Sequence, residues 1–248
     1  MSGERVAKFL SSAGYCSRRD AERLIAEGRV SVNGKVLDTP ATLVTGKDAV
    51  KVDGKRINGN HLDSAPRLFV YHKPAGLVTS HRDEKGRATV FDYLPPHLPR
   101  VISIGRLDLD SEGLLLLTTS GALSRAMELP MNSQERVYRV RIRGTLMETH
   151  LNKLARGVIV DGVKYKPIDV EVDDAKTQGR NRWLTVTLRE GKNREIRRIF
   201  ESFDLPVSRL IRTGYGEFAL GNLRENEVKE VPAQQVKALM QQLKVEQD

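Results

Sequence analysis

Two acidic residues stand in a short polar segment between two apolar runs. Asp108 and Asp110 follow the run 101–104 and precede the continuous apolar run 114–117. Short apolar runs bounded by Gly and Asp are typical of buried strands. The segment therefore presents carboxylates above a predicted sheet, where a carboxylate can act as a nucleophile or as an acid or base. Asp and Gly also form ordinary turns, which is the alternative interpretation of the same residues.

The spacing of the two carboxylates leaves a second chemistry open. Two residues apart on an extended segment, Asp108 and Asp110 would lie ~7 Å from each other. Paired carboxyl groups standing apart across a bond are the arrangement found in glycosidases. Hydrolysis of a nucleoside or sugar is therefore an alternative on these residues alone.

A tyrosine on a neighbouring predicted strand could complete a site for a base. The segment 136–142 alternates between apolar and polar residues and predicts a half-exposed strand with Tyr138 on the same face as Arg136 and Val140. A tyrosine flanked by arginines is a platform on which a base can stack, although it can equally pack in a core.

Residues 193–203 predict an amphipathic helix, because apolar residues recur there at i, i+3, i+4 and i+7. Arg194, Arg197 and Arg198 line its flank. With Lys192 just before it, the start of the helix offers a place for a phosphate, while the same charges could simply face water.

The charge of the chain indicates a polyanionic partner. Its 248 residues carry a formal net charge of +9 at pH 7, and the pI is about 9.7. Such a balance favours nucleic acid or an anionic membrane surface. Apolar stretches all fall short of the ~20 residues that span a bilayer, and no signal-peptide core follows Met1. We therefore expect a cytoplasmic protein that binds nucleic acid and not a membrane.

Cysteine and histidine usage predicts neither a metal nor a cofactor. Cys16 is the single cysteine, which excludes an internal disulfide framework and a multi-cysteine zinc site. The five histidines include no His-x-x-x-His pair, and phosphate-binding glycine motifs are absent from the sequence. No strong apolar interface pattern stands out, so we expect a monomer.

The N-terminal segment predicts two short helices followed by tight β turns. Gly14 is expected to end the first helix and Ser17 to cap the second. Asn33-Gly34 between alternating apolar residues is a strong hairpin signal. Residues 1–60 contain eleven Lys and Arg against seven Asp and Glu. The arginines of the second helix could line a nucleic acid or form a solvated face.

The polar segment 58–66 contains Gly and Pro and is typical of a linker between domains. We predict domains over 1–62 and 63–240, with a tail over 241–248. The second domain begins with a strand over 67–71. Lys73 follows this strand and could meet a phosphate or be solvated.

The segments that carry chemistry also carry a resemblance to known families. Residues 17–25 and 28–34 resemble the S4 RNA-binding domain. The remainder resembles the pseudouridine synthases, in particular the branch that joins an S4 domain to a synthase domain, acts on ribosomal RNA and includes the large-subunit enzymes. The matching segments are 73–76, 86–92, 105–108, 113–118, 138–140, 191–198 and 210–214.

This resemblance implies roles for individual residues. Asp108 would be the nucleophilic aspartate that cleaves the uridine C1′–N1 bond and lets the base rejoin through C5. Tyr138 would stack on the flipped base, and Arg197 would pair with the aspartate, without metal or cofactor. Asp110 would be a loop residue, and Arg136 stands where many relatives have lysine. We expect RNA contacts from Arg18, Arg19, Arg23, Arg29, Lys73, Arg106, Lys192, Arg194 and Arg198.

The predicted fold class is α+β. A small S4-like α/β RNA-binding domain should precede a catalytic domain with a mixed, mainly antiparallel sheet and flanking helices. The expected function is isomerisation of a specific uridine in ribosomal RNA, of the large subunit (23S). The alternative is a non-catalytic RNA-binding or ribosome-assembly protein, which would show salt-dependent binding but no chemical product.

Overall fold

The computed structural model describes residues 3–58, 65–132, 134–178 and 181–245. The helices are α1 (Val6–Ser12), α2 (Arg18–Ala26), α3 (Gly121–Glu128), α4 (Glu148–Arg156), α5 (Glu195–Glu201) and α6 (Ala233–Gln242), with 3₁₀ turns η2 (Val90–Tyr93) and η3 (Pro130–Asn132). The strands are β1 (Glu4–Arg5), β2 (Val30–Val32), β3 (Lys35–Val36), β4 (Leu43–Val44), β5 (Val50–Val52), β6 (Lys55–Arg56), β7 (Leu68–Lys73), β8 (Ile102–Ile104), β9 (Glu112–Thr118), β10 (Arg136–Arg143), β11 (Ile159–Val160), β12 (Val163–Lys164), β13 (Asp169–Gln178), β14 (Asn181–Leu188), β15 (Val207–Tyr215), β16 (Phe218–Ala219) and β17 (Val228–Glu230).

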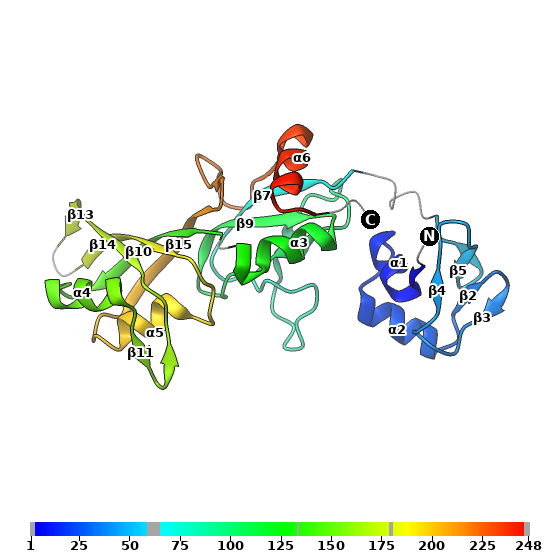
Figure 1. Cartoon of the computed structure of the whole chain (residues 1–248), viewed down its shortest axis with the longest axis horizontal. Helices are drawn as coiled ribbons and strands as arrows, with labels where there is room; N and C mark the ends of the chain where they lie inside the picture. Colours follow the sequence, from blue (N-terminus) through cyan, green and yellow to red (C-terminus); the bar gives the residue numbers. More distant parts are fainter. Residues whose placement is uncertain (1–2, 59–64, 133, 179–180, 246–248) are drawn as a thin grey trace.

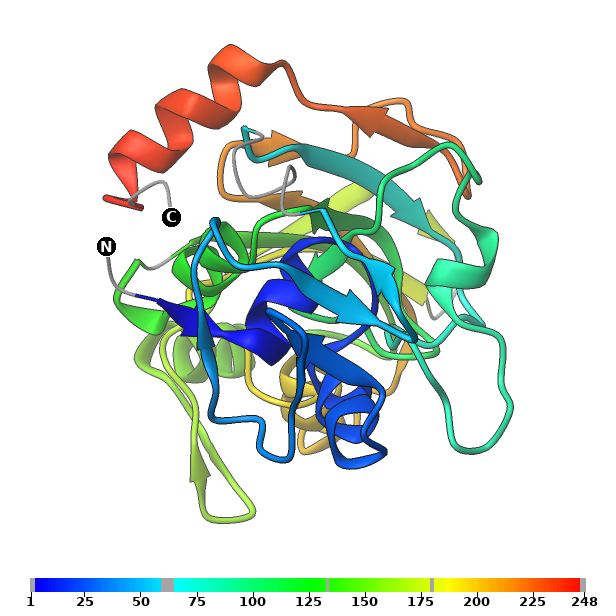
Figure 2. The same cartoon turned by 90° about the vertical axis from the view of Figure 1, so that its right-hand side faces the viewer.

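The N-terminal unit has the predicted pair of helices and tight hairpins. The Ser17 hydroxyl caps α2 by accepting a hydrogen bond from the Asp20 backbone N–H. Asn33 and Gly34 have φ of 51° and 87° and form the turn between β2 and β3. The four-stranded sheet β3-β2-β5-β6 and the helix pair share one apolar core that includes Phe9. Figures 1 and 2 show this unit at one end of the molecule.

The predicted domain boundary at residue 62 lies outside the described residues. At the other end of the chain, α6 continues to Gln242 and packs on the second domain through the buried side chains of Val236, Leu239 and Met240. The limits of the domains remain predictions.

A mixed sheet organises the second domain, as the sequence predicts. Its strand order is β13-β14-β10-β15-β9-β7-β17, with β8 also paired to β9 and β16 to β15. The pair β15 and β9 is parallel, and the other pairs are antiparallel. In Figure 1 the long strands run across the domain, with β13 at the end far from the N-terminal unit.

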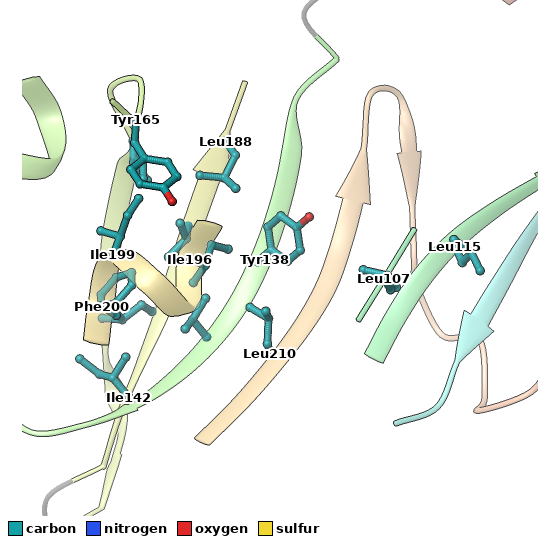
Figure 3. Close-up of a cluster of buried hydrophobic side chains, with 14 of the residues drawn as sticks. Leu107, Leu115, Tyr138, Ile142, Tyr165, Leu188, Ile196, Ile199, Phe200 and Leu210 are labelled. Carbon is teal, nitrogen blue, oxygen red and sulfur yellow. The ribbon is translucent and has the colours of Figure 1, made fainter. Parts of the chain in front are cut away.

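Two apolar cores lie on opposite faces of this sheet. Side chains alternate along a strand, so Leu114 and Leu116 of β9 face one core while Leu115 and Leu117 face the other. Helices α3 and α6 cover the first face. Helices α4 and α5 cover the second face over β10 and β14, and Figure 3 shows the side chains that meet there.

Gly113 makes the parallel junction between β9 and β15 possible. Its φ is +106°, and a Cβ at this position would lie 2.7 Å from the backbone nitrogen of Arg212 and closer still to its carbonyl oxygen. Only a residue without a side chain permits this approach. The junction brings the end of the loop that contains Asp108 against β15.

Candidate active site

Asp108 lies in the loop between β8 and β9, and hydrogen bonds hold the backbone of this loop. Leu107 is buried; its N–H donates to Thr79 Oγ1 at 3.3 Å and its carbonyl accepts from the same hydroxyl at 2.9 Å. The Gly105 N–H donates to the carboxylate of Glu128 at 3.1 Å. The Asp108 side chain is 32% exposed. The fold thus holds an accessible carboxylate on an anchored loop.

This carboxylate lines a cavity of about 420 Å³ formed by the β8–β9 loop, β10, β15 and the segment before α5. Arg106, Tyr138, Lys192 and Arg194 line the same cavity. The structure therefore brings together predicted site residues from three separate parts of the sequence.

Tyr138 faces the cavity from β10, on the face that the alternation predicts. Val140 and Ile142 continue the same face into the apolar core. The ring of Tyr138 is buried at the edge of this core, and Figure 3 shows its hydroxyl oxygen pointing away from Ile199 and Phe200. The tyrosine is both a core residue and a wall of the cavity. Its stacking on a base stays a prediction.

The aspartates and arginines pair differently from the prediction. Arg194 Nη1 lies 3.5 Å from Asp108 Oδ2, and the Arg194 guanidinium donates to both carboxylate oxygens of Asp110 at 3.1 and 3.3 Å. Arg197 Nη2 donates to the Asp110 carbonyl at 2.9 Å and lies 3.3 Å from Asp110 Oδ2. Arg197 therefore holds Asp110, and Arg194 is the cation beside Asp108.

Asp110 is consequently more than a loop residue. Burial alone would raise its pKa, but hydrogen bonds from Arg194 and the charges of Arg197 and Arg194 outweigh burial and lower the pKa of Asp110. The general acid of a glycosidase needs a raised pKa. Asp110 is instead an ionised anchor for two arginines.

Helix α5 begins at Glu195, slightly later than the predicted start near Asn193. Arg194 stands before the first turn in a left-handed backbone conformation with φ of 50°. Arg198 lies on the exposed side of the helix and donates to Asn193 Oδ1 at 3.4 Å. Its predicted RNA contact would therefore lie outside the cavity.

Lys192 reaches the cavity wall with its charge already compensated. Its Nζ donates to Glu190 Oε2 at 2.7 Å, and its backbone N–H donates to Glu195 Oε2 at 3.0 Å. Glu195 is 3% exposed, and burial raises its pKa to about 7, with the neighbouring Glu190 adding to the rise. A buried carboxyl group thus holds the segment that carries Lys192 and Arg194.

Lys73 does not have the predicted role in RNA contact. It is completely buried, and its Nζ donates to the carbonyls of Pro74 at 3.0 Å and Ser111 at 2.7 Å. Burial lowers its pKa to about 8, while the charge of Asp108 acts in the opposite direction. The apolar strand before Lys73 continues through the lysine into the interior, so this amine supports the β8–β9 loop from beneath.

Three further residues of the cavity were not among the predicted site residues. Arg136, Arg212 and Tyr215 line it from β10 and β15. Arg136 shares the predicted face of Tyr138, so strand alternation could have indicated it. Arg212 and Tyr215 come from a strand about 70 residues further along the chain, and only the strand pairing places them beside Tyr138.

The predicted RNA-binding arginines of the N-terminal unit lie on its surface. Arg18 and Arg19 are exposed on α2. Arg23 is paired with Asp20 and Glu27. Arg29 is also ion-paired, with Glu27 and with both carboxylate oxygens of Asp53. Carboxylates therefore already neutralise the charges of Arg23 and Arg29, whereas Arg18 and Arg19 are described by their exposure alone.

Within the described residues, no group of three or more His, Cys, Asp or Glu side chains could hold a metal ion. A search of the same residues for a long apolar helix able to cross a membrane finds none.

Comparisons with known proteins identify both domains. The family model described as RNA pseudouridylate synthase matches residues 67–202, and the S4 domain model matches residues 4–50. A protein named as an uncharacterized RNA pseudouridine synthase of Rickettsia felis is 50% identical over 228 residues, which cover 92% of this chain and 96% of that protein. Ribosomal large subunit pseudouridine synthase B of Xylella fastidiosa is 40% identical over 252 residues, which cover 99% of this chain and 52% of that protein.

A solved structure shows the same fold. The crystal structure of a pseudouridylate synthase superposes with a TM-score of 0.66 at 24% identity, over 95% of this chain and 99% of the other. The whole chain, with its S4 unit and mixed sheet, therefore has the fold of that structure. With residues 67–202 matching the family model and half of all aligned positions identical in the Rickettsia relative, this chain is a member of the RNA pseudouridine synthase family, enzymes that isomerise uridine in RNA.

Proposed function

We propose that this enzyme converts a specific uridine of large-subunit ribosomal RNA to pseudouridine, with Asp108 as the nucleophile. The observation that carries the proposal is the position of Asp108. Its partly exposed carboxylate lines a cavity whose wall is Tyr138, and Arg194 lies 3.5 Å away. The Arg194 guanidinium can hold the Asp108 carboxylate in place by charge, and a carboxylate is a competent nucleophile.

The chemistry fits a carboxylate in such a cavity. Attack of Asp108 at C1′ forms a bond to the ribose and breaks the C1′–N1 bond, so the base leaves with the electron pair. The base then turns, C5 bonds to C1′, and the carboxylate departs. C5 loses a proton and N1 gains one, so the atoms balance without an oxidant or reductant. Tyr138 offers an aromatic face to a uridine that has been flipped out of its helix.

Ribosomal RNA as the substrate rests on two supports. The relative in Xylella fastidiosa is named as a large-subunit ribosomal enzyme. The chain also carries a net charge of +9, and Arg18 and Arg19 are exposed on the S4 unit. Positive charge on both domains suits a long RNA backbone.

The test combines cells and purified protein. Pseudouridines are mapped in ribosomal RNA from cells with and without the gene, and the purified protein is then given the RNA from the deficient cells. We expect one position or a small set to lack pseudouridine in those cells and to regain it on incubation.

Asp108→Asn should lower turnover by at least about 10³-fold while RNA binding stays near normal, because only the nucleophile is lost. The matched control is Asp161→Asn, at an exposed aspartate in the turn between β11 and β12, which should keep full turnover. Full turnover by Asp108→Asn would refute the assignment of the nucleophile. Unchanged ribosomal RNA in the deficient cells would refute the substrate.

A further inference from the structure

Two guanidinium groups lie close to one buried tyrosine ring in the wall of the cavity. The Cζ of Arg136 is 4.8 Å from the centroid of the Tyr215 ring, and the Cζ of Arg212 is 5.1 Å from it. Tyr215 is 1% exposed and Arg212 is 2% exposed. The Tyr215 hydroxyl accepts from Arg136 Nη2 at 3.1 Å and donates to the Met127 carbonyl at 3.0 Å, which fixes the ring.

These two cations have no carboxylate partner within the described part of the chain. Arg136 Nη1 donates to the Gln134 carbonyl, and Arg212 Nε donates to the Leu114 carbonyl. Arg212 Nη2 is buried and makes no hydrogen bond to another described residue. Guanidinium groups stay charged in proteins, and buried charges are normally paired. An anion that binds here would supply the missing partner.

One acidic side chain lies near the cluster of Arg136, Arg212 and Tyr215, but it already accepts hydrogen bonds from other groups. Glu128 lines the same cavity, and its Oε1 accepts from the Gly105 N–H and from the Ser124 hydroxyl. It holds the loop of Asp108 rather than an arginine. The cluster therefore keeps an excess of positive charge, and its ligand should be negative.

The strand register places this cluster beside the tyrosine proposed to hold the base. Tyr138 on β10 lies directly opposite Arg212 on β15, and Arg136 lies opposite Tyr215. Side chains that are opposite on antiparallel strands have Cβ atoms about 5 Å apart. A nucleotide whose base stacks on Tyr138 would thus have its backbone near the two guanidinium groups.

Resting on the proposed function, we propose that Arg136, Tyr215 and Arg212 form a binding site for an RNA phosphodiester group next to the target uridine. Arginine suits this ligand because its planar donors match phosphate oxygens. The site anchors the backbone while the base lies over Asp108.

The test is binding of the full-length protein to ribosomal RNA from cells lacking the gene, measured over a series of KCl concentrations. Arg136→Gln should weaken binding about tenfold and lower the slope of log K against log salt by about 1, as expected for one lost phosphate contact. Arg136→Lys keeps the charge and should retain most of the slope. Arg212→Lys keeps the charge but loses the planar donors. It should therefore weaken binding while lowering the slope of log K against log salt by much less than 1. The matched control is Arg141→Gln, on the opposite face of β10, where Arg141 Nε donates to Ser208.

Melting temperatures are measured for every variant, because Arg136 also contacts the core. A reduced slope in Arg136→Gln, restored by Arg136→Lys, supports the phosphate site. Equal binding and slope in Arg136→Gln and Arg141→Gln would overturn it, as would equal weakening by Gln and Lys with an unchanged slope. If the wild-type protein forms no pseudouridine, the proposed function fails, whereas the salt slopes still decide whether this site binds phosphate.

Discussion

Arginines in the cavity and arginines on the N-terminal unit are held in opposite ways. Around the cavity, Arg194 and Arg197 are fixed by Asp110, and Arg212 is buried behind the strand junction. On α2, Arg18 and Arg19 project from an exposed face. The first group is held by an acidic partner or by burial, whereas Arg18 and Arg19 project into solvent. We therefore expect the S4 unit to act mainly through affinity for RNA, and the arginines of the synthase domain also to position the reacting groups.

The largest expected effect concerns the strand junction behind the cavity. Gly113→Ala would force a Cβ against the Arg212 backbone at a φ of +106° and should cost about 3 kcal/mol of unfolding free energy. Urea denaturation measures this loss. Gly162→Ala is the matched control: its φ of +76° is also strained, but a Cβ there meets nothing within 4 Å, so the cost should be only about 1 kcal/mol. Equal losses would show that the close approach is unimportant.

The second prediction tests whether Asp110 positions the arginines. Asp110→Asn removes the charge that pairs with Arg194 and Arg197, so turnover should fall about tenfold at saturating RNA. Steady-state kinetics measure kcat and KM separately. The control is Asp169→Asn, which breaks an exposed pair with Arg189, neither residue of which lines the cavity. If both variants turn over like the wild type, the arginines need no anchor.

A third prediction tests the exposed arginines of α2, Arg18 and Arg19. The double variant Arg18→Gln with Arg19→Gln should lower the salt slope of RNA binding by about 1 to 2 and leave kcat at saturating RNA unchanged. Filter binding and turnover assays measure the two effects. The double variant Arg23→Gln with Arg29→Gln should weaken binding less, because both residues are already paired with carboxylates. A loss of kcat in the first variant would contradict the division of labour between the domains.

The last prediction concerns the pH dependence of stability that Glu195 causes. Its pKa is raised to about 7 in the folded protein, so the folded state holds a proton that the unfolded state releases above pH 4.5. The contribution to stability is complete at low pH and is lost as pH rises through about 7. Between pH 5 and 8 the wild type should therefore lose about 2.5 kcal/mol relative to Glu195→Gln, whose amide does not titrate.

Urea denaturation of both proteins at pH 5 and pH 8 measures this difference. Burial lowers the pKa of His81, but His81 is present in both proteins, so its contribution cancels in the comparison. Parallel pH profiles for the two proteins would show that Glu195 is not protonated in the folded state.

Local patterns in the sequence were sufficient for much of the fold. The hairpin at Asn33-Gly34, the cap at Ser17 and the alternation around Tyr138 all depend on neighbours within a few residues, and the structure confirms them. The start of α5 was predicted slightly early, because a left-handed residue at Arg194 is invisible to hydrophobic periodicity.

Pairings between distant residues could not be predicted in the same way. Lys73 carries a charge, which suggested solvent or phosphate, but β7 takes it into the interior beneath the loop of Asp108. Arg197 was expected to pair with Asp108, yet a shift of two residues along the loop places Asp110 in its reach instead. Such choices depend on side-chain geometry across segments 38 and 87 residues apart.

The sequence by itself determined the two kinds of domain and the basic character of the chain, because local motifs and composition carry this information. It also led to the proposal of Asp108 as the nucleophile. Only the tertiary structure decided which cation stands beside Asp108, that Lys73 is buried, and that Arg136 and Arg212 meet at Tyr215. The physical reason is that two charged side chains form an ion pair only if the fold brings them close together. The pairing of β9, β10 and β15 sets those distances, and they cannot be predicted from the spacing of the residues along the chain.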